Sequence, residues 1–341
     1  MQQFLQPAID LFERIPLLGM TVAGLTVFGG MCVVALGLVL MERKVAADFQ
    51  TRPGPNRYGP YGAFQTIWDA LKLLRKEDIR PTAVDFWVWF AAPVIVFVAA
   101  FAAYVTIPFD PVLYVKDLNI GVLYVFAIAS WGVIGVLMAG WGSNNRYSLF
   151  GGLRSAAQLI AYEAPMILAA LGPVALAGTL SLRGIVEAQQ GVWYVLLQPV
   201  GFVIYLITAV AETNRTPFDM PEAEAELTGG FHAEYSGMKF AMFFLAEYAN
   251  MVLVCSLATV LFLGGWQGPW LPGFVWFFLK VGFLVFLFIW FRWTFPRVRV
   301  DQLMVFAWKV LLPLAFLNLL LTGLLIVLGV FIITLAMTRY V

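Results

Sequence analysis

Carboxylates inside apolar segments are the residues of this 341-residue chain with the most potential for chemistry. Glu163 and Glu247 lie within stretches long enough to cross a membrane, and Glu212 closes a third such stretch. A charge at the bilayer centre costs at least about 2.5–3.5 kcal/mol, so such residues are functional candidates. Burial and mutual repulsion would raise their pKa values towards neutrality and make them titrate as a coupled set. The three glutamates therefore predict proton handling at pH 7.

The loop after Glu212 extends this acidic character. It contains the carboxylates Asp219, Glu222, Glu224 and Glu226, faced within the loop by Arg215. Prolines at 217 and 221 restrict the backbone here, which favours a folded acidic funnel. The alternative is a structural ion pair of Glu163 or Glu247 with Arg154, Arg215 or Lys280. We expect the acidic cluster to prevail, because carboxylates outnumber the nearby cations.

Two further segments combine charges with unusual backbone chemistry. Glu42, Arg43 and Lys44 close the first apolar stretch, and residues 51–62 follow with several prolines and glycines that exclude a helix. Residues 292–299 contain three arginines beside aromatic side chains. Anchoring at the lipid headgroups explains the basic residues but explains Glu42 poorly. The alternative for residues 292–299 is that one guanidinium faces the acidic cavity or a ligand.

The elements that must position these residues are transmembrane helices. The chain is 62% apolar and 12% charged, whereas soluble chains are about 45–50% apolar and about 25% charged. We expect an all-α polytopic membrane protein that forms one helical domain over residues 1–341. Eight stretches approach the roughly 20 residues that a span needs: about 17–41, 86–107, 120–141, 156–180, 193–211, 240–263, 274–291 and 310–338. Because acidic residues at 10 and 13 precede a first stretch long enough to span, we expect no cleavable signal.

An amphipathic helix is expected between the first two spans. Phe64, Ile67, Trp68, Leu71 and Leu74 follow helical spacing, with polar residues between them. The segment is too short and too polar to span, so it should lie in the membrane interface, either as a passive float or as a threshold for a ligand from the lipid.

Charge and composition exclude several classes of function. The net charge of +1 provides no basic surplus for nucleic acid. Two cysteines and one histidine are too few for an iron–sulfur cluster, a bis-histidine haem or a tetrahedral zinc site, so we expect no metal. Sixteen of the 21 Lys and Arg residues fall in the loops after spans 1, 3, 5 and 7. The positive-inside rule then predicts that both termini face outward.

Several motifs in these loops and spans occur together in one family. They are Glu42-Arg-Lys44, Arg52-Pro-Gly-Pro-Asn56, Gly59-Pro-Tyr-Gly62, Asp69-Ala-Leu-Lys72, Gly140-Trp-Gly-Ser-Asn-Asn145, Ala161-Tyr-Glu163, Ala211-Glu-Thr-Asn-Arg-Thr-Pro-Phe-Asp219, Glu222-Ala-Glu-Ala-Glu226, Ala246-Glu-Tyr248 and Arg292-Trp-Thr-Phe-Pro-Arg297. From about residue 17 onward the chain resembles the quinone-chamber membrane subunit of respiratory complex I. The bacterial members of this family are the H subunits of that enzyme, and the mitochondrial members are NADH dehydrogenase subunit 1.

The resemblance implies a subunit of a proton-pumping NADH:quinone oxidoreductase, with eight helices and no redox centre of its own. Quinone, such as ubiquinone, would enter from the bilayer and be reduced by the terminal iron–sulfur cluster of a peripheral subunit. FMN and the iron–sulfur clusters would belong to partner subunits, and small membrane subunits would lead to antiporter-like subunits. The expected location is a bacterial inner membrane, with the mitochondrial inner membrane as the alternative.

The resemblance also implies residue roles. The quinone chamber would be lined or bordered by Glu42, Arg43, Asp69, Phe244, Tyr248 and Arg292. The acidic passage that couples reduction to proton movement would contain Tyr162, Glu163, Glu212, Glu222, Glu224, Glu226 and Glu247, joined by Lys280. Arg215, Asp219 and Arg297 would hold the loops that shape the chamber. Spacing by itself does not identify quinone.

Two other functions compete with this interpretation. A stand-alone proton-coupled transporter would use the same glutamates, but transporters usually show repeated halves and broken helices, which we do not find in the sequence. The membrane anchor of an energy-converting hydrogenase shares much of the pattern. The interfacial helix and the Pro/Gly loop favour the quinone version.

Overall fold

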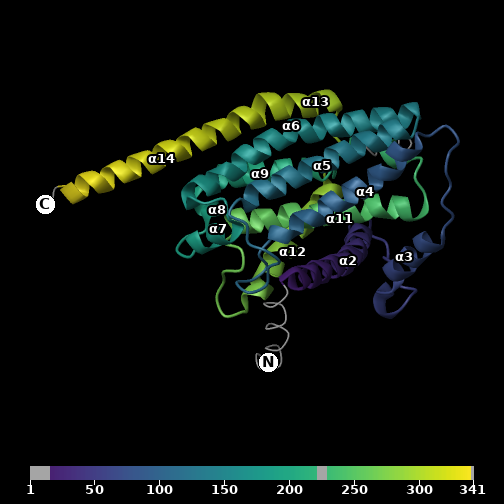
Figure 1. Ribbon diagram of the computed structural model, residues 1–341, viewed down its shortest axis with the longest axis horizontal. Coiled ribbons are helices and arrows are strands. Elements are labelled where there is room, and N and C mark those ends of the chain that lie inside the picture. Colours follow the sequence, from purple (N-terminus) through teal and green to yellow (C-terminus); the bar gives the residue numbers. More distant parts are fainter. Residues whose placement is uncertain (1–15, 221–228, 339–341) are drawn as a thin grey trace.

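The computed structural model describes residues 16–220 and 229–338, and this part of the chain is helical with no strand (Figure 1). Seven helical segments are long and apolar enough to cross a membrane. The helices that form them are α2 (Pro16–Phe49), α4 (Phe86–Ala102), α5 (Gly121–Gly142), α6 (Arg146–Ala177), α11 (Gly237–Phe262), α12 (Gly273–Thr294), and α13 (Val300–Phe306) with α14 (Leu312–Thr338). These helices confirm the expected all-α polytopic membrane fold.

The fifth expected span differs from the prediction. Residues 193–211 form a short turn of helix, α8 (Tyr194–Leu197), followed by α9 (Pro199–Glu212). Pro199 has no amide hydrogen to donate into a continuous helix, so the helix starts anew at this residue. The 14 residues of α9 reach about 21 Å, less than the roughly 30 Å of a hydrocarbon core. The described chain thus has seven long apolar segments and one shorter apolar helix.

Several helices extend beyond the apolar stretches that predicted them. Helix α2 continues to Phe49, so Glu42 and Arg43 lie on a helix instead of at its end. Helix α6 begins at Arg146, where Asn145 caps it by accepting a 3.0 Å hydrogen bond from the amide of Tyr147. A helix can leave the hydrocarbon and still satisfy its own backbone, which is why hydropathy underestimates its length.

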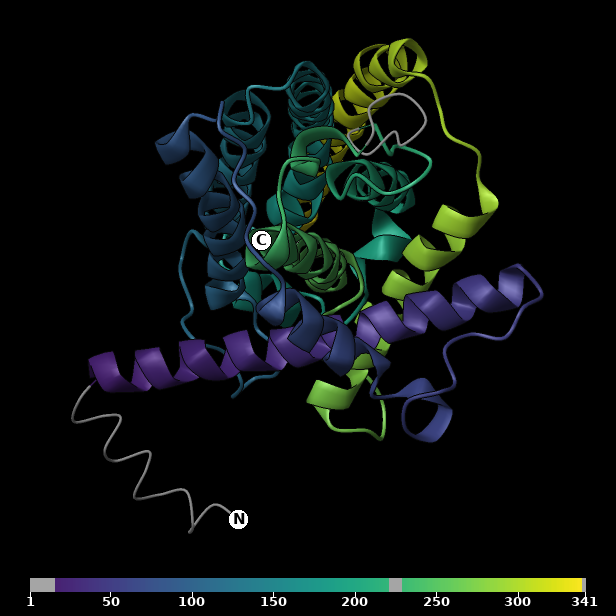
Figure 2. The ribbon, with the colours of Figure 1, turned by 90° about the vertical axis from the view of Figure 1, so that its right-hand side faces the viewer.

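Helix α11 forms the centre of the bundle. Its apolar window is 61% buried, the highest fraction among the seven long segments. It packs against α4, α9 and α12, while α5 and α6 pack against each other beside it. Figure 2 looks along the bundle and shows α11 (green) near the middle, with α2 (purple) crossing at a steep angle. Helix α14 extends beyond its neighbours (Figure 1).

The predicted amphipathic segment is helix α3 (Gln65–Arg75), which packs against α2 and α11. The connections 50–64, 143–145, 213–236 and 295–299 lie at the same end of the bundle, on the right in Figure 1. Most of the motifs identified in the sequence fall in or next to these connections.

Candidate functional site

Glu42 is the centre of a buried charge network. Its side chain is 8% exposed and accepts hydrogen bonds from three residues that are far apart in the sequence. Nη1 of Arg215 lies 3.1 and 3.2 Å from the two carboxylate oxygens, and the hydroxyl of Tyr248 donates to Oε2 over 2.6 Å. Nη1 of Arg292 donates to Oε1. These contacts join α2, α11 and α12 to the loop after α9.

Arg215 connects this carboxylate to a second one. Its Nε lies 2.9 Å from Oε1 of Glu247, and its side chain is 3% exposed. The ion-pair alternative considered for Glu247 is therefore what the structure shows. Burial lowers the pKa of Arg215, but the carboxylates of Glu247 and Glu42 outweigh this and raise it above its ordinary value. The guanidinium remains charged and is shared between two acids.

Tyr248 packs against the same guanidinium. Its ring centroid lies 4.6 Å from the guanidinium carbon of Arg215 and 4.9 Å from the ring centroid of Phe244. We call Glu42, Arg215, Glu247, Tyr248 and Arg292 the charge network. Two acids and two guanidiniums balance within it, which offsets the large cost of burying charge.

The backbone around Arg215 is held by a buried glutamine. Nε2 of Gln158, on α6, donates to the carbonyls of Ala211 (2.7 Å) and Phe218 (2.8 Å). These carbonyls lie on either side of the loop, so one side chain fixes both of its ends. The carbonyl of Arg215 also accepts a 2.9 Å hydrogen bond from the amide of Phe218. Arg215 is thereby positioned over the end of α9.

A cavity of about 400 Å³ opens beside the network, and we call it the outer cavity. It is lined by Val39, Glu42, Arg43, Ala46, Arg52, Pro53, Gly54, Pro55, Phe244, Tyr248, Arg292 and Trp293. Five of the six residues expected at the quinone chamber are in this wall. The sixth, Asp69, lies 2.5 Å from Nη1 of Arg43, which ties α3 to the cavity. The structure thus brings all six into one neighbourhood.

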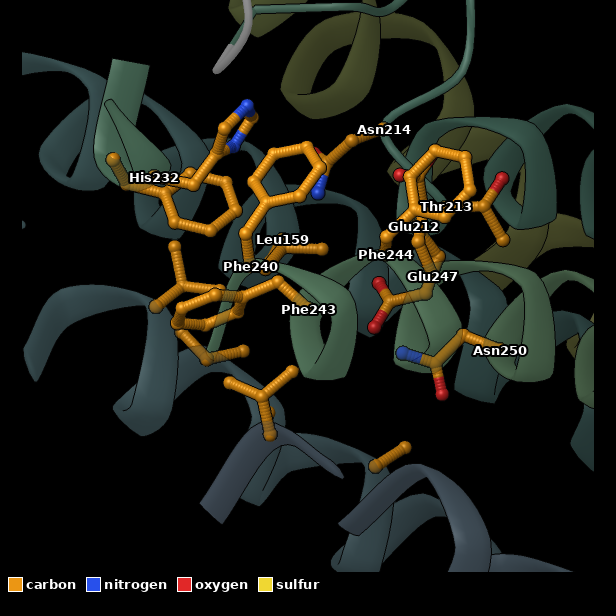
Figure 3. Close-up of a pocket in the computed structure, with 16 residues that line it drawn as sticks. Leu159, Glu212, Thr213, Asn214, His232, Phe240, Phe243, Phe244, Glu247 and Asn250 are labelled. Carbon is orange, nitrogen blue, oxygen red and sulfur yellow. The ribbon is translucent and has the colours of Figure 1, made fainter. Parts of the chain in front are cut away.

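A second cavity of about 90 Å³, the inner cavity, lies on the other side of the network (Figure 3). Its wall consists of Val96, Ala129, Gly132, Val133, Val136, Leu159, Glu212, Thr213, Asn214, Phe231, His232, Phe240, Phe243, Phe244, Glu247 and Asn250. It has room for several water molecules. Glu212 and Glu247 both face it, and Phe244 belongs to the walls of both cavities.

Glu212 and Glu163 continue the acidic line away from the outer cavity. One carboxylate oxygen of Glu212 is buried and has no hydrogen-bond partner among the described residues. Glu163 lies close enough to interact with it electrostatically and hydrogen-bonds to the hydroxyl of Ser130 on α5. Asp219 interacts electrostatically with Glu247. Glu222, Glu224 and Glu226 lie outside the described residues.

Three predicted residues lie elsewhere. Lys280 donates to the carbonyls of Leu263 (2.6 Å), Gly265 (2.9 Å) and Gln267 (2.7 Å), at the far end of α11. The three hydrogens of its ammonium group are therefore used by the backbone, and it makes no contact with the acidic line.

Tyr162 and Arg297 also lie away from the glutamates. The hydroxyl of Tyr162 donates to the carbonyl of Leu303 over 3.0 Å, and so holds α6 to α13. Arg297 is exposed, in a segment where the amide of Val298 donates to the carbonyl of Pro217 over 3.1 Å. This contact joins the loop after α12 to the loop that carries Arg215.

Sequence reasoning missed Ser130, Asn250 and His232. Asn250 follows Glu247 by three residues and therefore shares its helix face, a signal that was available. Ser130 and His232 are brought in by tertiary contacts that no spacing reveals. Burial lowers the pKa of His232 to about 4, so this ring is neutral at pH 7.

Comparisons with known proteins agree with one another. A family profile described as NADH dehydrogenase matches residues 22–323. The H subunit of NADH-quinone oxidoreductase from Dehalococcoides mccartyi (strain CBDB1) is 52% identical over 297 residues, covering 87% of this chain and 84% of that protein. The H subunit from Anoxybacillus flavithermus is also 52% identical, over 304 residues that cover 86% of this chain and 91% of the relative. The Geobacter metallireducens H subunit that carries the number 1 is 50% identical over 299 residues, 85% of this chain and 91% of the relative.

Proposed function

Because this chain belongs to the family of the H subunits of NADH-quinone oxidoreductase, we propose that it forms the quinone chamber of that enzyme and couples quinone reduction to proton translocation. The observation that carries the proposal is the path of contacts from the outer cavity, through Glu42, Arg215 and Glu247, to the inner cavity.

The outer cavity supplies the chemistry that a quinone requires. Arg43, Arg52 and Arg292 are guanidinium donors for the two carbonyl oxygens of the ring. Phe244, Tyr248 and Trp293 provide aromatic faces, and small apolar residues of α2 line the side towards the lipid. Reduction of a quinone takes up two electrons and two protons. The electrons come from NADH through FMN and iron–sulfur clusters, which the partner subunits hold.

The charge network supplies the coupling. A negative charge that appears on the quinone during reduction attracts the guanidiniums that now hold Glu42. Any movement of Arg215 towards the outer cavity weakens its ion pair with Glu247. Glu247 then faces the inner cavity without its counter-charge, and its affinity for a proton rises. Glu212 and Glu163 extend this response into the membrane arm.

The same proposal fixes partners and location. Peripheral subunits would dock at the end of the bundle that carries the charge network, and small membrane subunits would lead from Glu163 to antiporter-like subunits. The relatives named above are bacterial, which favours a bacterial inner membrane with both termini on the periplasmic side.

Affinity purification from membranes in mild detergent, followed by photolabelling, tests the proposal. We expect a large assembly with flavin, iron–sulfur signals and inhibitor-sensitive NADH:quinone reductase activity. A photoreactive quinone should label peptides of α2, α11 or α12 around the outer cavity, and excess unlabelled quinone should compete. Recovery of a lone chain without redox centres, or labelling confined to other segments, would contradict it.

A further inference from the structure

Helix α3 carries an apolar stripe that no other part of the described chain covers. Ile67, Trp68, Leu71 and Leu74 are between 42% and 60% exposed, and Phe64 precedes them on the same side. Thr66, on the opposite face, is buried, because this face packs against α2 and α11. The stripe therefore points away from the bundle.

Three basic residues lie along one edge of this stripe. Lys72, Arg75 and Lys76 are exposed, and their spacing of three and four residues makes them neighbours on one helical edge. Like charges at this spacing repel one another unless an anion joins them.

The nearby carboxylates leave this basic edge unneutralised. Asp69 is the sole acidic residue of α3, and it is engaged by Arg43 (2.5 Å) and by Nε2 of Gln65 (3.1 Å). Asp78 pairs with Lys239. Of the residues that the structure describes, none forms an ion pair with Lys72, Arg75 or Lys76.

We propose that Lys72, Arg75 and Lys76 bind the phosphate of an anionic phospholipid while the stripe around Trp68 enters the acyl region. An apolar face bordered by cations, on a helix too short to span, fits the surface of a membrane. Long basic side chains reach outward to headgroups while their methylene stems stay on apolar surface. The positive-inside rule places α3 on the cytoplasmic side, where anionic lipids concentrate.

The proposal has a structural link to the outer cavity. Asp69 joins α3 to Arg43, and Arg43 lines that cavity. A lipid that draws α3 towards the membrane therefore acts on the cavity wall through one ion pair. The lipid site itself does not depend on what the cavity binds.

Photo-cross-linking of lipids to the intact assembly in nanodiscs tests the inference. Diazirine-labelled phosphatidylglycerol and phosphatidylcholine are compared at equal mole fraction, and labelled peptides are mapped by mass spectrometry. We expect phosphatidylglycerol to label residues 64–76 several-fold more than phosphatidylcholine does. The preference should shrink as salt is raised from about 0.05 to 0.5 M, because salt screens exposed charges.

Two matched variants locate the site. K72Q/K76Q should lower labelling by phosphatidylglycerol roughly fivefold for each charge removed. R146Q/K309Q removes two exposed charges elsewhere and should leave labelling unchanged. Equal labelling of wild-type α3 by both lipids would overturn the proposal without a variant. Cross-links from α3 to a partner subunit in place of lipid would instead make this surface a protein interface. These readouts are independent of quinone turnover.

Discussion

The guanidinium of Arg215 lies 2.9 Å from Glu247 while it also holds Glu42, so one cation serves two carboxylates on different helices. Glu42 belongs to the outer cavity and Glu247 to the inner one. A charge change in one cavity is therefore transmitted to the other through a single side chain. No chain of separate proton donors is needed for this step.

Replacing Glu247 tests that transmission. Glu247→Gln keeps the shape of the side chain and removes its charge, so the assembly should form while Arg215 shifts fully to Glu42. We expect NADH:quinone reductase activity to fall about tenfold or more, because the network is left with an unbalanced buried cation. The control R215Q/E247Q removes both charges and should restore thermal stability relative to R215Q. Normal turnover and normal pumping in E247Q would reduce Glu247 to a structural role.

Lys280 should act on stability and not on turnover. Lys280→Met leaves the carbonyls of Leu263, Gly265 and Gln267 without their donor. We expect a loss of roughly 3 kcal/mol, seen as a lower melting temperature of the purified assembly. Lys309→Met, at an exposed site, should change stability by less than about 0.5 kcal/mol. A fall in turnover per intact assembly at unchanged stability would return Lys280 to the acidic passage.

The Pro/Gly loop should control the shape of the outer cavity. Gly62 has φ +76°, and a Cβ placed there would lie 2.0 Å from the carbonyl oxygen of Pro55, a cavity residue. Gly62→Ala must therefore move the loop, and the apparent KM for quinone should rise about tenfold, matching a strain of about 1–2 kcal/mol. Gly37→Ala on α2, where a Cβ meets nothing within 4 Å, is the control. Equal KM values in both variants would separate the loop from the substrate.

His232 should make stability fall in mild acid. Its folded pKa is about 4 because burial disfavours the charged ring, and its unfolded pKa is near 6.5. Between these values the unfolded state binds more protons, so stability is present above about pH 6.5 and is lost as the pH falls towards 4. The loss approaches roughly 3 kcal/mol. His232→Phe should remove this component in melting curves between pH 7.5 and 5, and an unchanged pH dependence would contradict it.

Local patterns predicted much of this protein because hydropathy and helical spacing are local properties. The apolar stretches located seven long segments, and the spacing from Phe64 to Leu74 identified α3. The break at Gln198 was missed, because total hydropathy does not register where a proline interrupts the hydrogen bonds.

The partners of the charged groups needed the tertiary structure. Arg215 was expected to face a surplus of carboxylates, yet the loop held by Gln158 sets it between two of them. Lys280 was expected on the acidic axis, because its position in a span does not reveal that its helix face meets the carbonyls at the end of α11. The resemblance to a known family selected the residues around Glu42, and the fold brought them together.

Phe244 separates the two cavities, and the partition is one side chain thick where its ring belongs to both walls. In an energy-converting enzyme such a partition limits leakage. If water passed from one cavity to the other, protons could equilibrate without doing work, and redox energy would be dissipated as heat. The yield of transported charge per electron pair would then depend on an aromatic ring that itself never carries charge.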